Sequence, residues 1–179
     1  MPELPPDLSL RELSADDAAA VAELIGVCDR TFFDIAPPGW RPPSQYQEMS
    51  KWEKRLSEEP LWSLAAFDRD GTLVAFVTMR QARGEDQPDQ LLPGVGHLGA
   101  LFVHPDRWRQ GIATYLLEQA ELAMVERGFP RARLWTAERA PARHFYQRHG
   151  WVATEESRFR EDFGMTVVGY EKRLVDPDP

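Results

Sequence analysis

The stretch VGHLGALFVHPDRWRQGIATYLLEQA, residues 95–120, decides the fold because a strand pattern and a helix pattern meet within it. Residues 95–103 are almost continuously apolar, which is typical of a central strand that is buried on both faces. A cationic segment follows, and from Gly111 onward apolar residues recur with the spacing of a helix face. The sequence therefore predicts a strand, a short glycine-containing loop and a long helix over 111–127.

The loop before this helix is expected to bind an anion. The first amides of a helix lack partners within the helix, and its N-terminus carries a partial positive charge. Gly111 has no side chain to prevent close approach, and Arg107 and Arg109 add positive charge. Such an arrangement most often holds phosphate, although a surface turn that only happens to contain glycine is the alternative. The chain has neither GxxxxGK(S/T) nor GxGxxG followed by an acidic residue about 20 positions later, so a P-loop or dinucleotide fold is not expected.

The pattern on either side of this stretch predicts an α/β fold. Further strands are expected at 8–13, 61–68, 72–80, 131–137, 151–159 and 164–174. Consecutive strands joined by turns are antiparallel, whereas the strand–helix–strand unit over 95–137 requires a parallel pair. We therefore expect a single domain over 1–179, with its core at about 8–174 and a loose tail at 175–179. Its sheet should be mixed, mostly antiparallel and twisted, with about seven strands and about four flanking helices.

Three local expectations accompany this fold. The first helix, capped by Ser14, should bury the stripe Ala18, Val21, Ile25 and Cys28. A second helix should follow the proline-rich loop 36–44 and carry Tyr46, Met49, Glu53 and Leu56 on one side. Residues 82–94 should form a long polar loop, and a short helix should begin at Pro141 and end at Gly150.

Composition narrows the classes of function. With 179 residues, 42% of them hydrophobic and 28% charged, the chain can bury a substantial core. A net charge of -8 argues against non-specific nucleic-acid binding as its main role. No apolar run approaches the ~18 residues of a membrane span, and the N-terminal segment lacks the features of a signal peptide. The single cysteine, Cys28, fits a reducing compartment. We therefore expect a cytoplasmic protein with neither nucleic-acid nor membrane partners, and a homodimer remains open.

Two segments carry a resemblance to a known family. LFVHPDRWRQGIATYLLEQA and ARLWTAERAPARHFYQRHGW, residues 101–120 and 132–151, resemble the GCN5-related N-acetyltransferases, or GNAT family. The first family signature is a strand, (Q/R)xxGx(G/A) and a long helix, and here Gly111 and Ala113 occupy its small positions. The second is Asn-xx-Ala-xxx-Tyr-xxx-Gly-aromatic, which is matched by Ala142, Tyr146, Gly150 and Trp151.

This chain departs from the family pattern at two positions. Trp108 stands at the (Q/R) position, with an arginine on either side, and Arg139 stands where the second signature has Asn. Both changes affect side-chain contacts to the cofactor and leave the backbone loop intact. The flanking arginines would compensate for them.

The resemblance implies that acetyl-CoA is the cosubstrate and that no metal is needed. The loop amides would hold its pyrophosphate, and the preceding strand would run beside its pantetheine arm. Carried over residue by residue, the implied contacts are Leu101, Phe102 and Val103 on the strand, Trp108, Arg109, Gln110, Gly111, Ile112, Ala113 and Thr114 in the loop and helix start, and Arg139.

Acetyl transfer to an amine needs a group that accepts the amine proton and a group that protonates the leaving thiolate. The resemblance places Tyr146 beside the sulfur as the acid, although its position on the apolar stripe of its helix equally fits a core residue. His97 in the strand and Glu138 after 131–137 are the two candidate bases. A water relay without a dedicated base is a third alternative.

The function that the sequence favours is an acetyl-CoA-dependent N-acetyltransferase acting on a small-molecule or peptide amine by direct attack in a ternary complex. A non-catalytic acyl-CoA-binding regulatory module is the main alternative, and an O-acetyltransferase is a weaker one. The acceptor is expected near aromatic residues of 32–46 and near an acidic turn, and the alternative for the aromatic residues is that they simply belong to the core. These residues are Phe32, Phe33, Trp40, Tyr46, Glu161 and Asp162.

Overall fold

The computed structural model describes residues 3–58 and 61–175. Seven strands form one sheet in the order β1-β2-β3-β4-β5-β7-β6. β4 and β5 are parallel and every other neighbouring pair is antiparallel, so the expected mixed, mostly antiparallel sheet is confirmed. The strands are β1 (Ser9–Arg11), β2 (Trp62–Phe67), β3 (Leu73–Arg83), β4 (Leu91–Val103), β5 (Arg131–Ala137), β6 (Val152–Arg160) and β7 (Met165–Arg173).

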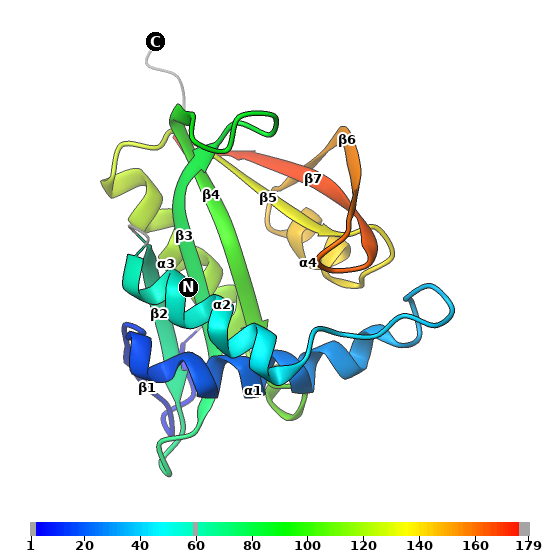
Figure 1. Ribbon diagram of the computed structural model, residues 1–179. Helices are drawn as coiled ribbons and strands as arrows, with labels where there is room; N and C mark the ends of the chain where they lie inside the picture. The colour runs from blue at the N-terminus through cyan, green and yellow to red at the C-terminus, as the bar shows by residue number, and fades with distance from the viewer. Residues whose placement is uncertain (1–2, 59–60, 176–179) are drawn as a thin grey trace.

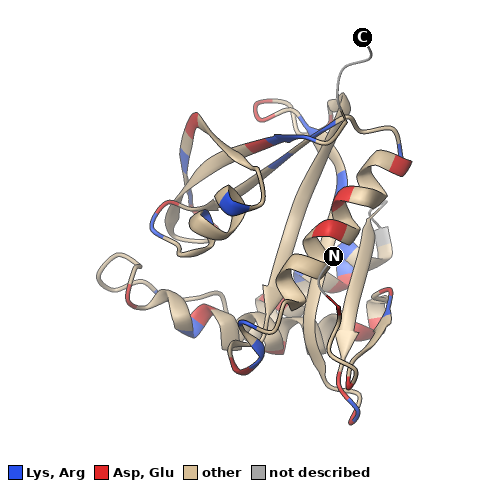
Figure 2. Ribbon diagram, turned by 180° about the vertical axis from the view of Figure 1, so that it is seen from behind, with Lys and Arg blue, Asp and Glu red and all other residues tan. Residues whose placement is uncertain are grey.

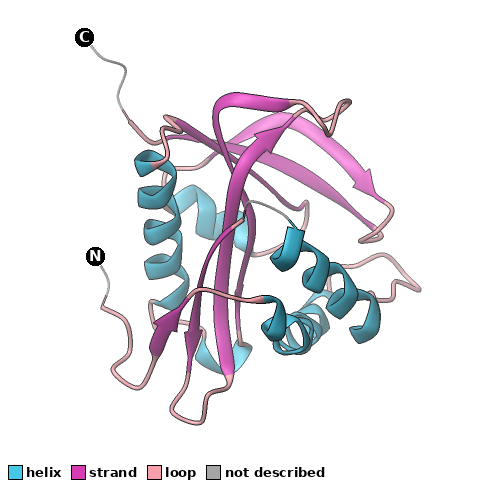
Figure 3. Ribbon diagram, turned by 60° about the vertical axis from the view of Figure 1, so that its left-hand side comes forward, coloured by secondary structure: helices cyan, strands magenta, loops and turns pink. Residues whose placement is uncertain are grey.

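Helices cover both faces of the sheet, as Figures 1 and 3 show. The α-helices are α1 (Ala18–Asp29), α2 (Gln45–Glu58), α3 (Ile112–Glu126) and α4 (Ala142–Arg148), with short 3-10 turns at Ala15–Asp17, Arg30–Phe32 and Pro105–Arg107. α1 and α2 pack on one face around Phe76 and Trp52, and the expected stripe of α1 is buried there. α3 packs on the other face with Tyr146 of α4. No helix within the described ranges combines the length and apolarity needed to cross a membrane.

The sheet opens between its two parallel strands. β4 and β5 pair only from Val95–Leu98 to Arg131–Leu134, whereas β5 pairs with β7 along its whole length. β5, β6 and β7 therefore leave β4 together as one arm (Figure 1). Gly99 is an extra residue in β4, because Leu98 lies opposite Met79 and Ala100 lies opposite Thr78. Such a bulge bends a strand, and here it lies where the two strands separate.

Two local expectations are wrong in part. In α2, Met49 and Leu56 pack against the core, but Tyr46 is 74% exposed and Glu53 is also exposed, while Glu48 and Trp52 are buried. Hydrophobic periodicity misplaces part of the buried face because one of its members is a carboxylate, which accepts hydrogen bonds from Lys51 and Trp52.

The loop expected over 82–94 is also shorter, because β3 and β4 continue as a ribbon and leave only residues 84–90 between them. Arg83 lies opposite Leu91 at the end of this ribbon. Antiparallel strands with one face toward water can carry polar residues. The polar composition of this segment therefore suggested a loop where β3 and β4 are in fact paired.

Candidate active site

The start of α3 presents a group of free amides. Gly111 is its N-cap and has a φ of 80°, a left-handed conformation that glycine adopts without steric cost. Among the described residues, the amides of 109–114 find no backbone or side-chain acceptor, whereas Trp108 donates to the carbonyl of Pro105 and Tyr115 to that of Gly111. Consecutive free amides at a helix N-terminus suit a bound anion such as phosphate.

Side chains of the loop and of the start of α3 contact neighbouring parts of the fold and do not pair with the free amides. Trp108 donates from Nε1 to the carbonyl of Val103 at 2.8 Å, which fastens the loop to the end of β4. Arg107, expected to add free charge, is instead paired with Asp7. Thr114 Oγ1 lies 3.1 Å from His149 Nε2. Arg109 is exposed and is therefore the cation that can screen an anion at this place.

Beyond the bulge, β4 offers one edge that is not paired with β5. The amide of His104 donates to Val74 of β3, so strand alternation directs the backbone groups of Phe102 toward β3 as well. The same alternation directs those of Leu101 and Val103 toward the open edge, but the Val103 carbonyl already accepts from Trp108. Among the residues described at this edge, Leu101 therefore has both its amide and its carbonyl free to pair with an extended ligand, whereas Val103 has only its amide free.

A cavity of about 660 Å³ occupies the space where β4 and β5 separate. Gly99, Leu101 and Phe102 of β4, Trp135 of β5 and Tyr146 of α4 line it. The Tyr146 side chain is buried, and burial raises the pKa of its phenol well above the ordinary value. Its hydroxyl makes no hydrogen bond to the described part of the chain, so Tyr146 lines the cavity as a protonated donor without a partner.

The two bases expected from the sequence are placed differently. His97 lines the cavity, but burial and the nearby charges of Arg80 and Arg133 lower its pKa to about 3. An imidazole with so low a pKa is neutral at physiological pH and is a weak proton acceptor. Glu138 is exposed and does not line the cavity, and the same is true of Arg139.

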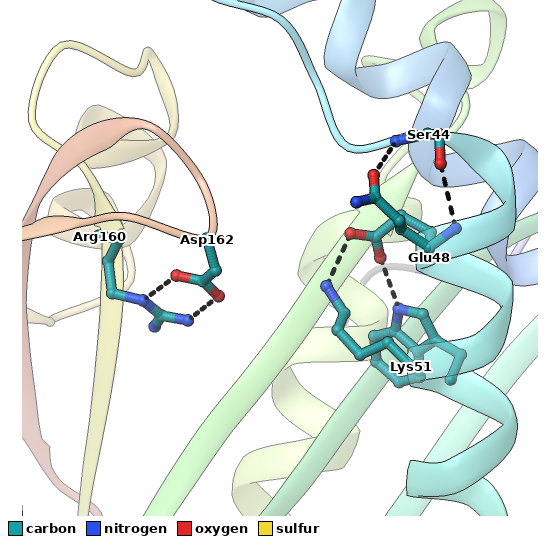
Figure 4. Close-up of polar contacts among 7 residues, drawn as sticks. Ser44, Glu48, Lys51, Arg160 and Asp162 are labelled. Carbon is teal, nitrogen blue, oxygen red and sulfur yellow. Dashed lines mark hydrogen bonds and ion pairs between the residues drawn. The ribbon is translucent and has the colours of Figure 1, made fainter.

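Asp29, which sequence reasoning missed, is a buried carboxylate on the cavity wall. Burial and the charge of Glu48 raise its pKa to about 6, with Lys51 opposing them. No hydrogen bond links its side chain to the rest of the described chain, unlike Glu48, which accepts from Lys51 Nζ at 2.7 Å (Figure 4). A signal was present in the sequence, since Asp29 follows Ile25 by four residues and continues the buried stripe of α1.

The opposite wall of the cavity is the turn between β6 and β7. There Arg160 pairs with Asp162 through Nε at 2.8 Å and Nη2 at 2.6 Å, across the gap from α2 in Figure 4. Glu161, Asp162 and Phe32, which the sequence suggested for the acceptor site, line the cavity. Three residues expected near the acceptor do not line it: Trp40 packs against Phe163 and donates to its carbonyl, and Phe33 and Tyr46 are exposed.

The sequence and fold were compared with known proteins. Residues 29–151 match the model of the acetyltransferase (GNAT) family. The chain belongs to this family. It is 24% identical over 154 residues to YuaI of Bacillus subtilis, named as an uncharacterised N-acetyltransferase, and the alignment covers 85% of this chain and 84% of YuaI.

Solved GNAT structures share the fold at low identity. An acetyltransferase from Desulfovibrio desulfuricans is 17% identical with a TM-score of 0.72, covering 94% of this chain and 99% of its own. The PaiA N-acetyltransferase of Thermoplasma acidophilum, solved with coenzyme A, is 19% identical with a TM-score of 0.63, covering 93% and 98%.

Both segments that resemble the GNAT signatures border the opening between β4 and β5. The first segment provides the free edge of β4 and the amides at the start of α3. The second provides β5 and α4, on which Tyr146 lines the cavity. Within the described residues, no group of three or more His, Cys, Asp or Glu side chains is arranged to hold a metal ion.

Proposed function

We propose that residues 8–174 form one N-acetyltransferase domain, which transfers an acetyl group from acetyl-CoA to the amine of a small molecule or peptide. The observation that carries this proposal is the position of the unpartnered Tyr146 hydroxyl in the cavity beside the unpaired edge of β4. A chain that only bound acyl-CoA would need the free amides at the start of α3, but it would have no use for a proton donor at the opening. Tyr146 therefore favours the enzyme over the regulatory module.

The residues of this chain fit acetyl-CoA as the acyl donor. The free amides of 109–114 would hold its pyrophosphate, and Arg109 would screen the charge. Leu101 would pair with an amide of the pantetheine arm through its backbone. The Val103 carbonyl is already occupied by Trp108, so Trp108 contributes by holding the loop against β4.

The chemistry divides between two cavity residues. The amine nitrogen forms a bond to the acetyl carbon as the carbon–sulfur bond breaks. Tyr146 gives its proton to the departing thiolate, and Asp29 accepts the proton of the amine, directly or through water. Asp29 suits this role because a pKa of about 6 leaves it ionised at neutral pH yet more basic than an ordinary carboxylate. His97 is too weak a base, and Glu138 is outside the cavity.

The pH profile should identify the base. Asp29 accepts a proton only when it is ionised, so kcat/KM should fall as the pH drops below about 6. Asp29→Asn should remove this acidic limb and lower kcat at pH 7 by about 10²-fold, the lower end of the range for general-base catalysis. The limb set by ionisation of the acceptor amine should persist in both proteins.

Two matched variants serve as controls for this experiment. His97→Gln should leave the limb near pH 6 in place, because the pKa of His97 is about 3. Glu138→Gln should have little effect, because Glu138 is exposed and outside the cavity. If Glu138→Gln removed the limb and Asp29→Asn did not, the assignment of Asp29 would be wrong.

The function itself is tested by release of the CoA thiol from acetyl-CoA in the presence of amines, amino acids, polyamines, aminoglycosides and peptides. We expect release that depends on the acceptor. An alcohol panel run in parallel tests the O-acetyltransferase alternative. Binding of acetyl-CoA without consumption in any of these mixtures would favour the regulatory module.

A further inference from the structure

The charge of the cavity is opposite in sign to that of the protein. The chain has a net charge of -8, yet among the described residues seven basic and five acidic side chains line the cavity. Arg83, Arg133 and Arg158 lie at the end of the cavity marked by His97, and we refer to these three as the arginine cluster. Figure 2 shows basic positions along the arm that carries β5, β6 and β7. Because the protein as a whole is acidic, the clustering of three guanidinium groups needs a local explanation.

One carboxylate, Glu85, partly neutralises the arginine cluster. It lies 3.0 Å from Arg133 Nη2 and also pairs with Arg158. Arg158 stacks over the Trp135 ring at 4.4 Å, and Arg83 donates to the Pro88 carbonyl at 3.3 Å. Each guanidinium has five N–H donors, so a single carboxylate satisfies only a fraction of the donors present.

The donors that remain are buried and without partners. Within the described part of the chain, no hydrogen-bond partner meets the Nε donors of Arg83, Arg133 and Arg158, nor the ring nitrogen Nδ1 of His97, which donates or accepts according to its tautomer. A buried polar group left without a partner costs about 1–3 kcal/mol, and more when it is charged. Three guanidinium donors at one end of one cavity indicate a missing acceptor rather than three unrelated defects. The chemistry that satisfies several guanidinium groups at once is an oxyanion.

The other end of the cavity has the opposite character. α2 turns Glu48 and Lys51 toward this end, where Asp29 lies beside Glu48, whereas Arg55 of the same helix acts on His97 at the end with the arginine cluster. Glu48 and Arg55 are seven residues apart, which corresponds to about 10 Å along a helix. Carboxylates that suit an ammonium group therefore lie at one end, and guanidinium groups that suit an oxyanion lie at the other.

We propose that the arginine cluster binds an oxyanion of the acceptor, so that the acceptor is an amine that also carries a carboxylate or phosphoryl group. This inference rests on the proposed function, because it names the substrate class of the same site. The amine would lie between Asp29 and Tyr146, and the oxyanion would meet the free Nε groups. A purely structural ion-pair network around Glu85 is the competing explanation, and it predicts no dependence on the charge of the acceptor.

Matched amines separate these explanations. δ-Aminovalerate and pentylamine share a primary amine and a similar chain, but only the first carries a carboxylate. We expect kcat/KM to be at least about tenfold higher for δ-aminovalerate, since a hydrogen bond to a charged group contributes roughly that factor or more. An aminoalkylphosphonate in a third arm distinguishes a site for phosphoryl groups from one for carboxylates.

Variants of the arginine cluster link the preference to its residues. Arg158→Gln should raise KM for δ-aminovalerate by at least about tenfold with little change in kcat, and should leave pentylamine unaffected. Arg158→Lys, which keeps the charge but loses Nε and the planar fork, should restore only part of the affinity. Arg131→Gln is the control, because Arg131 is exposed on the same arm and does not line the cavity.

Each outcome decides the inference. Equal kcat/KM for the two amines, or equal losses for both in Arg158→Gln, would overturn it while leaving the proposed function intact. If no amine is acetylated, the proposed function fails, and calorimetric binding of δ-aminovalerate in the presence of CoA then decides the inference alone. Binding that is lost in Arg158→Gln but kept in Arg131→Gln would support the oxyanion site. An absence of binding to the folded wild-type protein would overturn it.

Discussion

Tyr146→Phe is expected to lower kcat by about 10²–10⁴-fold, the usual range for loss of general-acid catalysis. The substitution removes one oxygen and almost no volume, so the ring contacts of Tyr146 with Trp151 and Tyr170 should survive. The apparent affinity for acetyl-CoA should stay within a few-fold, because the pyrophosphate would be held by amides at the start of α3. Turnover and binding should be measured on the same preparation.

Tyr170→Phe provides the matched control for this experiment. Tyr170 is also buried, but its hydroxyl accepts from Arg143 Nε at 3.0 Å. Its loss should affect stability more than kcat, since the hydroxyl already has a partner. Turnover of Tyr146→Phe near that of the wild type would return Tyr146 to a packing role. A thioester with a more acidic thiol should be less impaired by Tyr146→Phe, because its leaving group needs less protonation.

Gly111→Glu is expected to abolish binding of CoA. At about a hundred times its Kd, a ligand stabilises the folded state by about 2.7 kcal/mol, which corresponds to roughly 5–10 °C in Tm for a chain of this length. The added carboxylate would lie among the amides that are meant to receive the pyrophosphate, and its negative charge would repel that anion. The thermal shift caused by CoA should therefore disappear.

A second glycine, beyond the C-terminal end of α3, separates this effect from backbone strain. Gly128 follows the other end of the helix with a φ of 79°, and a side chain there would meet no neighbouring atom within 4 Å. Gly128→Glu therefore introduces the same left-handed strain and the same charge far from the free amides. It should lower Tm of the apo protein while keeping the CoA shift. A normal CoA shift in folded Gly111→Glu would show that the anion site lies elsewhere.

Much of the fold follows from local patterns that tertiary context does not override. The continuous apolar run of β4 and the periodic stripe of α3 predict a central strand, a loop and a long helix, and these are the elements observed. The turn over 69–71 predicts the β2–β3 hairpin in the same way. The segments that resemble the family signatures contain Gly111 and Tyr146, which lie beside the opening in the sheet.

The remaining features of the fold and the site depend on contacts between segments that are distant in the sequence. The separation of β4 from β5 is a tertiary property, and the extra residue at Gly99 is visible only from its pairing with β3. Burial of Asp29 and the shared position of Arg83, Arg133 and Arg158 arise from three-dimensional packing. A search for apolar periodicity does not detect polar residues that lie on a buried face. The sequence placed His97 among small apolar residues, but its cationic neighbours come from other strands and from α2.

The most direct measurement of the central claim is the stoichiometry of a single mixture of acetyl-CoA, enzyme and an acceptor amine. Released CoA thiol and N-acetylated product should be quantified together by a thiol assay and mass spectrometry, in wild type and in Tyr146→Phe. We predict one acetylated amine for each thiol released, with both signals strongly reduced in Tyr146→Phe. Acetyl-CoA that binds the wild-type protein and remains intact with every amine tested, including those that carry an oxyanion, would contradict the account.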